Sequence, residues 1–155
     1  MSNYTAEVRW VRGPHEVFTD NNYSRAHEWR FDGGVTVPAS SSPDIVPPPL
    51  SVAANVDPEE AFVAALSSCH MLFFLSFAAK RRLIVAEYLD QPVGVLGKDQ
   101  EGKMCMTRVT LRPRATFTGE RQPGREQIEK IHHLAHERCF IANSVKTEVV
   151  IEIPG

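Results

Sequence analysis

The sequence predicts an α+β fold in which antiparallel sheets pack against a long, buried central helix and a second helix. Three observations support this prediction. Strand patterns dominate the N-terminal third, one long apolar helix occupies the middle, and strands, a helix and a last strand follow it. A doubly wound parallel sheet would instead show strands and helices that alternate along the whole chain.

The length and composition are those of one globular domain. The chain has 155 residues, of which 43% are hydrophobic and 23% charged, and a net charge of −2. This composition argues against a disordered or disulfide-framework protein, and the balanced charge provides no surface for nucleic acid. We expect a single domain over residues 1–155, with an N-terminal strand layer at about 1–37, a Pro-rich loop at 38–57 and a helix–sheet core at 58–155.

The N-terminal layer is predicted to contain a strand and a hairpin. Apolar and polar residues alternate over Tyr4–Val11, which is the pattern of a half-buried strand. Farther along, His27–Phe31 and Val35–Val37 flank Asp32-Gly33-Gly34, where glycine supplies the positive φ of a tight turn. Pro and Ser dominate Pro38–Asp57, and a loop of this length is usually functional or a linker.

The central helix has the strongest local signals in the chain. Asp57 is a good N-cap, Pro58 suits the first helical position, and Glu60 completes a capping box. The helix is predicted to continue to about Arg82 and to be heavily buried. Its apolar stripe consists of Phe62, Leu66, Cys69 and Phe73, widened by Leu72, Phe74 and Phe77.

The uncharged stretch Ala61–Ala79 has nearly the length of a membrane-spanning helix. Its centre carries the polar block Ser67-Ser68-Cys69-His70, which a helix buried in protein tolerates better than one facing lipid. The chain start has no basic region followed by an apolar stretch, so no secretory signal is visible. We therefore expect a cytoplasmic protein that does not bind a membrane.

The C-terminal part is predicted to contain two strands, a helix and a last strand. The two strands, Gln91–Leu96 and Met104–Phe117, are joined by a turn at Asp99–Gly102. Apolar residues recur at helical spacing from Pro123 to about His136, and alternation marks a last strand over Val145–Ile153.

The three cysteines are Cys69, Cys105 and Cys139, an odd number that fits a reducing compartment better than a set of structural bridges. Cys69 lies too far into its helix for the helix dipole to ionise it. A reactive thiolate there would need a cation from elsewhere in the fold, and an arginine is the natural choice. The alternative is that Cys69 and Cys139 are core residues. Cys105 is interpreted as a bystander.

The histidines suggest two other chemistries, and neither is favoured. His132 and His136 share a helical face beside His133, but the glutamate of a His-Glu-x-x-His site is missing, so these residues are expected on a surface or half-buried helix face. His70 points about 100° away from Cys69 around a helix, which argues against a Cys–His hydrolase.

Two segments resemble a known family. The run from Asp57 to His70, with Cys69 near its end, is similar to the signature of the OsmC/Ohr family of osmotically inducible and organic hydroperoxide resistance proteins. Cys139, followed by Asn143-Ser144, resembles the second-cysteine segment of that family, and Arg25 provides an N-terminal match. The order of elements agrees over nearly the whole chain, and the chain looks most like the OsmC branch.

The resemblance implies a thiol-dependent organic hydroperoxide reductase with peroxiredoxin-type activity, part of an oxidative stress response. By this analogy Cys69 would be the peroxidatic nucleophile, Cys139 the resolving cysteine, Arg25 the cation that stabilises the thiolate, and Glu59 the carboxylate that orients Arg25. An external dithiol, for example a lipoyl protein, would reduce the disulfide, and no metal or organic cofactor is required. The substrate tail would lie among Phe62, Leu66, Met71, Leu72 and Phe73.

Helix geometry adds an expectation about assembly. On one continuous helix Glu59 and Cys69 stand about 15 Å apart along the axis and about 80° apart around it. If both act on one thiol, Glu59 must come from a second subunit or the helix must break, so we expect an intertwined homodimer with composite sites. The competing hypothesis is a non-catalytic dimeric module that binds a hydrophobic ligand and has structural cysteines.

Overall fold

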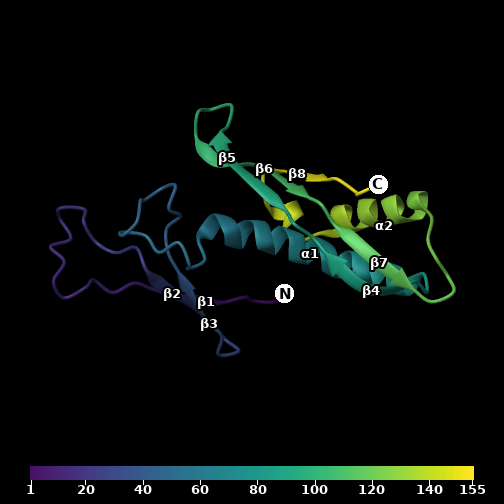
Figure 1. The fold of residues 1–155 in the computed structure, drawn as a ribbon, viewed down its shortest axis with the longest axis horizontal. Helices are drawn as coiled ribbons and strands as arrows, with labels where there is room; N and C mark the ends of the chain where they lie inside the picture. Colours follow the sequence, from purple (N-terminus) through teal and green to yellow (C-terminus); the bar gives the residue numbers. More distant parts are fainter. The chain divides into compact units, whose positions relative to one another are not determined.

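The computed structural model describes residues 1–155 and has the predicted α+β architecture. The chain divides into two compact units, Met1–Ala61 and Phe62–Gly155. Helix α1 (Pro58–Lys80) begins in the N-terminal unit and continues in the C-terminal unit. Figure 1 follows the elements in chain order from β1 to β8.

The N-terminal unit contains a three-stranded antiparallel sheet in the order β1-β2-β3, made of β1 (Ala6–Arg9), β2 (His27–Phe31) and β3 (Thr36–Ala39). The predicted β2–β3 hairpin is confirmed, and Gly34 in its turn has a φ of +94°, which favours glycine. Strand β1 is shorter than predicted, and all four of its residues are exposed in the single chain. The expected half-buried pattern is therefore absent from it.

The Pro-rich loop runs from Ser40 to Asp57 and starts two residues later than predicted, because Pro38 and Ala39 belong to β3. Its two ends are tied together. The Ser40 N–H donates to the carbonyl of Val56, and the Val56 N–H donates to the carbonyl of Pro38. The buried Ser40 hydroxyl accepts a hydrogen bond from the Val52 N–H at 2.9 Å. These bonds bring the end of the loop back to β3 and place Asp57 at the start of α1.

Helix α1 begins where the capping signals predict, because Asp57 Oδ1 accepts a hydrogen bond from the Glu60 N–H at 2.8 Å. The prediction of heavy burial is confirmed for Leu66 and Phe74. It is wrong for Cys69 and Phe73, whose side chains are only partly buried. A period of four places a different stripe in the core, and its second member is a histidine. The buried residues are Leu66, His70, Phe74 and Ala78.

By length and composition alone, α1 is the one helix of the structure that could cross a membrane. Its buried stripe instead packs into two apolar clusters of the C-terminal unit. Phe74 and Ala78 pack with Ile131, and Leu66 packs with Val109. This helix is therefore a core helix of a folded unit.

The C-terminal unit contains two sheets. Strand β4 (Ile84–Leu89) pairs antiparallel with β7 (Arg114–Thr118). The second sheet has the order β5-β6-β8 and consists of β5 (Val93–Lys98), β6 (Met104–Leu111) and β8 (Glu148–Ile151). Strands β6 and β8 are parallel, so the expectation of antiparallel pairing fails for this one pair.

The strand predicted over Met104–Phe117 is in fact two strands that belong to different sheets. The division falls at Arg112-Pro113, where proline has no N–H to offer to a ladder. Strand β4 had no predicted counterpart. The turn before it is made by Arg82 at a φ of +60°, and an arginine does not signal a left-handed turn in the sequence as glycine would.

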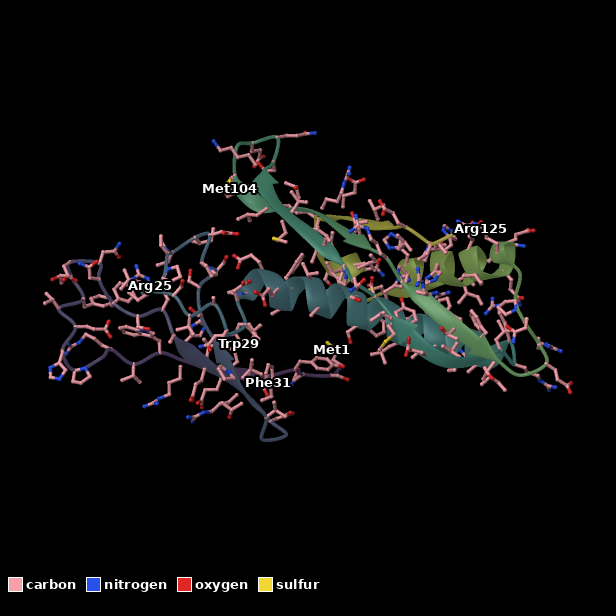
Figure 2. All side chains as sticks on the ribbon, viewed as in Figure 1. Met1, Arg25, Trp29, Phe31, Met104 and Arg125 are labelled. Atoms are coloured by element: carbon pink, nitrogen blue, oxygen red, sulfur yellow. The ribbon has the colours of Figure 1, made fainter.

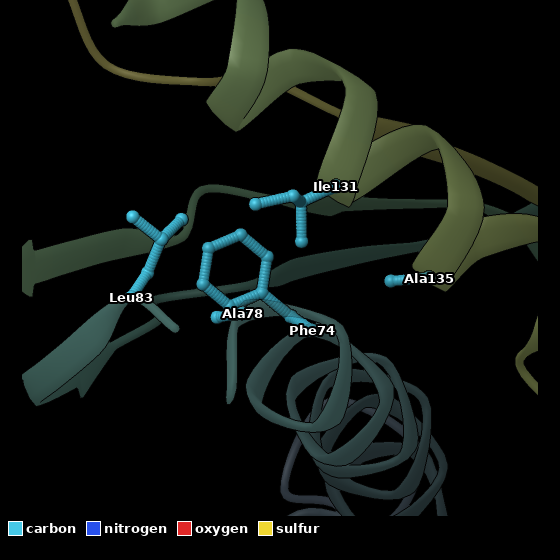
Figure 3. Packing of buried hydrophobic residues seen from close by; sticks show 5 residues of the cluster. All are labelled: Phe74, Ala78, Leu83, Ile131 and Ala135. Atoms are coloured by element: carbon cyan, nitrogen blue, oxygen red, sulfur yellow. The ribbon is translucent and has the colours of Figure 1, made fainter. Parts of the chain in front are cut away.

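Helix α2 (Arg125–Arg138) confirms the second predicted helix, and a short 3₁₀ helix, η1 (Ala142–Ser144), follows it. The main core joins α1 to α2. Figure 3 shows the Phe74 ring of α1 between Leu83 and Ile131, the latter on α2. Phe74, Ile131 and Ala135 are all fully buried.

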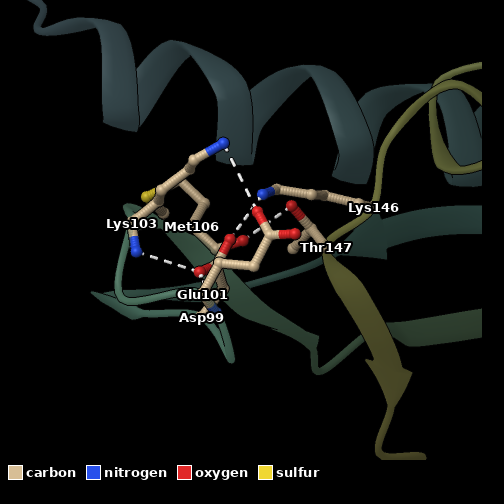
Figure 4. Close-up of polar contacts among 6 residues, drawn as sticks. All are labelled: Asp99, Glu101, Lys103, Met106, Lys146 and Thr147. Atoms are coloured by element: carbon tan, nitrogen blue, oxygen red, sulfur yellow. Dashed lines mark hydrogen bonds and ion pairs between the residues drawn. The ribbon is translucent and has the colours of Figure 1, made fainter.

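The predicted turn between β5 and β6 is confirmed and is built on Asp99. Its Oδ1 accepts hydrogen bonds from the N–H groups of Glu101 and Lys103, each at 2.9 Å, and its Oδ2 accepts one from Lys146 Nζ at 2.8 Å (Figure 4). The hydrogen bond from Lys146 and those from the turn lower the pKa of the Asp99 carboxyl. Asp99 thus connects the β5–β6 hairpin to the segment that leads into β8.

We expect Phe74→Ala to lower the free energy of unfolding by about 3–5 kcal/mol, because a fully buried ring is replaced by a cavity. Urea denaturation measures this change. The matched control is Phe31→Ala, whose ring is 41% exposed, with an expected loss below about 1.5 kcal/mol. Equal losses in the two variants would contradict the assignment of Phe74 to the core.

Candidate active site

Two cysteines meet in the C-terminal unit. Cys69 lies on α1, and Cys139 directly follows the last residue of α2. Both thiols are free, and Cys69 lies close enough to Cys139 to raise the pKa of the Cys139 thiol. The fold therefore brings together two residues that are seventy positions apart in the sequence. Cys105 is the third free thiol and lies on β6.

Cys139 is fully buried where the chain leaves α2. Its Sγ accepts a hydrogen bond from the Ala142 N–H at 3.4 Å, and its carbonyl accepts one from the Asn143 N–H at 3.0 Å. Burial raises the pKa of the Cys139 thiol to about 11, and contact with Cys69 adds to this increase. Cys139 is therefore protonated at neutral pH, which leaves Cys69 as the candidate nucleophile of the pair.

The apolar residues predicted to hold a substrate tail near Cys69 are spread over several faces of α1. Leu66 is fully buried in the core, whereas Leu72 is 61% exposed. The Phe73 ring meets the exposed ring of Phe140 edge to face, with 5.0 Å between centroids. Phe62 packs against the second apolar cluster, and Met71 is partly buried.

Arg25 lies in the N-terminal unit, on the loop that leads into β2 (Figure 2). Its guanidinium lies over the Tyr23 ring, with Cζ 3.6 Å from the ring centroid. It donates hydrogen bonds to the carbonyls of Asn21 at 3.0 Å and Tyr23 at 2.5 Å, and to Asn21 Oδ1 at 3.0 Å. All of these acceptors are neutral, so the positive charge of Arg25 has no carboxylate partner in the structure.

Two residues that no sequence pattern indicates, Asn21 and Tyr23, hold Arg25. Asn21 adopts a φ of +64°, which an asparagine tolerates better than most other residues, and this conformation directs its carbonyl and side-chain oxygen to the guanidinium. The only available signal was that Asn21 and Tyr23 lie close to Arg25 in the sequence. In a loop, where no regular period relates neighbouring residues, such closeness does not predict a contact.

Arg25 and Glu59 line the same pocket of the N-terminal unit, which has a volume of about 540 Å³. Glu59 is half-buried in the first turn of α1. The two side chains are not joined by an ion pair in this structure, so the orienting role of Glu59 stays a prediction. The rest of the wall includes the aromatic rings of Trp10, Phe18 and Tyr23 and the polar side chains of His27 and the serines at 40–42.

A buried histidine pair lies directly beside Cys69 in the sequence. His70 Nε2 and His132 Nδ1 are 2.9 Å apart, and their ring planes differ by 6°. The expectation of a surface or half-buried face for His132 is wrong, because this residue is 2% exposed and also stacks on Phe74. The structure contains no group of three or more side chains arranged to bind a metal ion. His132 occupies Nε2 of His70, while Nδ1 of His70 has no hydrogen-bond partner, so no hydrogen bond joins His70 to Cys69.

Both histidines are neutral in the folded protein. Burial, reinforced by the charges of His132 and His136, lowers the pKa of His70 to about 3. Burial also lowers the pKa of His132 to about 4. A hydrogen bond between two imidazoles requires one N–H and one lone pair, which the neutral forms supply.

This pair predicts a loss of stability in acid. The unfolded chain binds protons at these histidines near pH 6.5, while the folded chain does not until pH 3–4, so stability falls as pH drops through this window. The expected slope is up to about 1.4 kcal/mol per pH unit for each histidine. Urea denaturation between pH 7 and pH 5 should show a flatter profile in the double variant His70→Leu/His132→Leu, but not in the control His133→Leu, which replaces an exposed histidine. A slope unchanged in the double variant would contradict this account.

A family model described as OsmC-like protein matches residues 52–154 of the chain. The structure is similar to that of an OsmC-like protein of unknown function from Vibrio cholerae, with 63% identity and a TM-score of 0.98. That match covers 99% of this chain and 100% of the other. No curated protein matches the sequence significantly.

Two more distant structures share the fold. One is the organic hydroperoxide resistance protein OhrB of Bacillus subtilis, at 20% identity and a TM-score of 0.65, with 97% of this chain and 98% of the other covered. The other is an organic hydroperoxide resistance protein OsmC from Legionella pneumophila, at 15% identity and a TM-score of 0.62, with 99% and 97% covered.

Proposed function

Since this chain belongs to the OsmC-like protein family, we propose that it is a thiol-dependent reductase of organic hydroperoxides. The proximity of Cys69 and Cys139 carries the proposal, because a two-cysteine peroxidase needs its two cysteines near each other in the fold. Two structures of the same fold are named for organic hydroperoxide resistance, which supports this function.

In the first step the Cys69 thiolate attacks the terminal oxygen of a hydroperoxide ROOH. The O–O bond breaks, a sulfenic acid forms on Cys69, and RO⁻ leaves and takes up a proton to give ROH. The uncompensated charge of Arg25 suits it to stabilise the attacking thiolate and the developing alkoxide.

In the second step Cys139 condenses with the Cys69 sulfenic acid, which gives a disulfide and one molecule of water. Conversion of Cys69 to a neutral sulfenic acid removes its charge from beside Cys139, and this charge is one of the causes that raise the pKa of Cys139. An external dithiol then reduces the disulfide by thiol–disulfide exchange and is itself oxidised to a disulfide. Such turnover requires a reducing compartment, and we propose the cytoplasm.

We propose further that each site is shared by two chains of a homodimer. Arg25 and Glu59 line one pocket of the N-terminal unit, whereas Cys69 and Cys139 belong to the C-terminal unit. Helix α1 runs unbroken through Glu59 and Cys69, so the two residues stand about 15 Å apart along one helix. This separation is no obstacle if the pocket of one chain, with its Arg25 and Glu59, lies next to Cys69 of the partner chain.

The exposed face of α1 supports the dimer. Four residues at helical spacing form an uncharged stripe that is exposed in the single chain, namely Ala65, Ser68, Leu72 and Ser76. The small residues allow a close approach of a second helix, and the large apolar side chain of Leu72 gains from being covered. We therefore assign this stripe to the interface between two copies of the chain.

The pocket of about 540 Å³ also supports a second candidate function, that of a dimeric module which binds a hydrophobic ligand without catalysis. In that case the cysteines would be structural. The two functions differ in what happens to the thiols when a hydroperoxide is added.

Counting thiols tests the proposed function. Reduced protein mixed with an organic hydroperoxide should lose two of its three thiols and release one alcohol per chain, with Cys105 left free. Mass spectrometry of the digested protein should place the disulfide between Cys69 and Cys139. Retention of all three thiols would reject the reductase and favour the binding module.

A further inference from the structure

Three aromatic side chains of the N-terminal unit form one cluster at the wall of the pocket that contains Arg25. The ring centroids of Trp10 and Phe18 are 5.6 Å apart, those of Trp10 and Tyr23 are 5.6 Å apart, and those of Phe18 and Tyr23 are 4.7 Å apart. Trp10 is 38% exposed and Phe18 is 43% exposed. The cluster therefore presents ring surface to the pocket instead of burying it in a core.

The cluster is held in place by its loop. The Trp10 indole N–H donates to the carbonyl of Ser24 at 2.8 Å. The Glu16 carboxylate accepts hydrogen bonds from the Ser24 N–H at 2.7 Å and the Gly13 N–H at 2.9 Å, which ties together both ends of the segment that carries Phe18. Phe18 itself has a φ of +73°, a strained conformation for a bulky residue. Strain of this kind is concentrated at ligand sites, where the surrounding structure fixes a side chain.

The pocket has a polar and an apolar part. Arg25, Glu59, His27 and the three serines at 40–42 form the polar lining, and the three aromatic rings lie with Val8, Ile45 and Pro58 in the apolar lining. Arg25 stacks on Tyr23, so the guanidinium lies at the edge of the aromatic cluster, and Ile45 adds an apolar side chain to the wall. A ligand that fits has a flat apolar group against the rings and a group that bears or develops negative charge toward Arg25. The volume of the pocket is within the range of small-molecule sites.

We propose that Trp10, Phe18 and Tyr23 form a subsite that selects hydroperoxides with an aromatic ring, and hold that ring so that the peroxide group lies toward Arg25. The part of this inference that concerns the peroxide group rests on the proposed function. The part that concerns binding of the aromatic ring does not depend on it. Stacking of aromatic rings favours an aryl group over an aliphatic group of equal size by several-fold, up to roughly tenfold.

Binding is tested without any reaction in the Cys69→Ser variant. The probe is 2-phenyl-2-propanol, the alcohol that corresponds to an aryl hydroperoxide, and the signal is the fluorescence of Trp10 in a background where Trp29→Phe removes the other tryptophan. We expect 2-phenyl-2-propanol to bind several-fold more tightly than 2-cyclohexyl-2-propanol. Equal affinities, or no change in Trp10 fluorescence with the phenyl compound, would overturn the aromatic subsite.

A matched pair of variants locates the subsite. Phe18→Leu should weaken binding of the phenyl compound about fivefold, whereas Phe31→Leu should not, although the two phenylalanines are 43% and 41% exposed. Equal effects of the two substitutions would overturn the assignment to this pocket.

Kinetics separates this inference from the proposed function. With active protein, Phe18→Leu should lower kcat/KM for cumene hydroperoxide about fivefold and change that for tert-butyl hydroperoxide less than twofold. A uniform loss for both substrates would overturn the inference while leaving the reductase in place. Absence of turnover with either substrate would reject the reductase, and the alcohol measurements would still decide the aromatic subsite.

Discussion

Cys69→Ser is expected to lower the rate of organic hydroperoxide reduction by about a thousandfold or more, because a serine hydroxyl does not supply a nucleophile comparable to a thiolate. The rate is measured as loss of hydroperoxide with an excess of dithiol. The variant should keep its fold, since Cys69 is only partly buried and serine is close to it in size.

Cys139→Ser should stop turnover at a different step. Its Cys69 should still react once with the hydroperoxide, so a burst of about one alcohol per chain is expected, followed by little further consumption. Dimedone, which reacts with sulfenic acids, should label Cys69 in this variant. The control Cys105→Ser should turn over like the wild-type protein, because Cys105 lies on β6 and is not part of the pair.

These cysteine variants discriminate between the two roles that the sequence left open. Full activity in Cys69→Ser would reject the nucleophile, and full multiple turnover in Cys139→Ser would reject the resolving role. Equal losses in Cys105→Ser and Cys139→Ser would contradict the bystander role of Cys105.

The second large effect is the recovery of activity when two inactive variants are combined. Arg25→Ala and Cys69→Ser should each be strongly impaired alone. Unfolding and refolding them together should restore about a quarter of wild-type activity, because half of the dimers are then hybrids and one of the two sites in each hybrid is intact. The measurement is the rate of hydroperoxide reduction before and after co-refolding.

The control mixtures use residues from the same half of the composite site. Arg25→Ala mixed with Glu59→Gln places one defect in each N-terminal pocket of the hybrid, so no site is intact and no recovery is expected. Cys69→Ser mixed with Cys139→Ser fails for the same reason in the C-terminal unit. A separate control for Arg25→Ala is Lys80→Ala, which removes a cation at the end of α1. This single variant should leave sulfenate formation nearly unchanged.

Recovery in all three mixtures, or in none of them, would contradict composite sites. A protein that is an active monomer by light scattering would also reject them. Arg25→Ala and Lys80→Ala with the same rate of sulfenate formation would move the cationic role away from Arg25.

The sequence by itself determined those features that depend on neighbouring residues. The start of α1 follows from the Asp57 cap, and the β2–β3 hairpin follows from Gly34, because a cap or a turn is decided within a few residues. The signature around Cys69 indicated the family because it, too, is a short run of neighbouring residues. Strand β4 was missed since Arg82 makes a left-handed turn without a glycine to announce it.

Only the tertiary structure decided which residues act together. Cys69 and Cys139 meet because α1 and α2 pack through Phe74 and Ile131, and no local pattern specifies a contact over seventy positions. The same packing turned His70, rather than Cys69, into the core, where it pairs with His132. Arg25 is held by hydrogen bonds to neutral loop oxygens, which leave its charge uncompensated and follow no sequence period. Local chemistry thus determined the start of α1 and the β2–β3 turn, and packing between distant elements determined the candidate site.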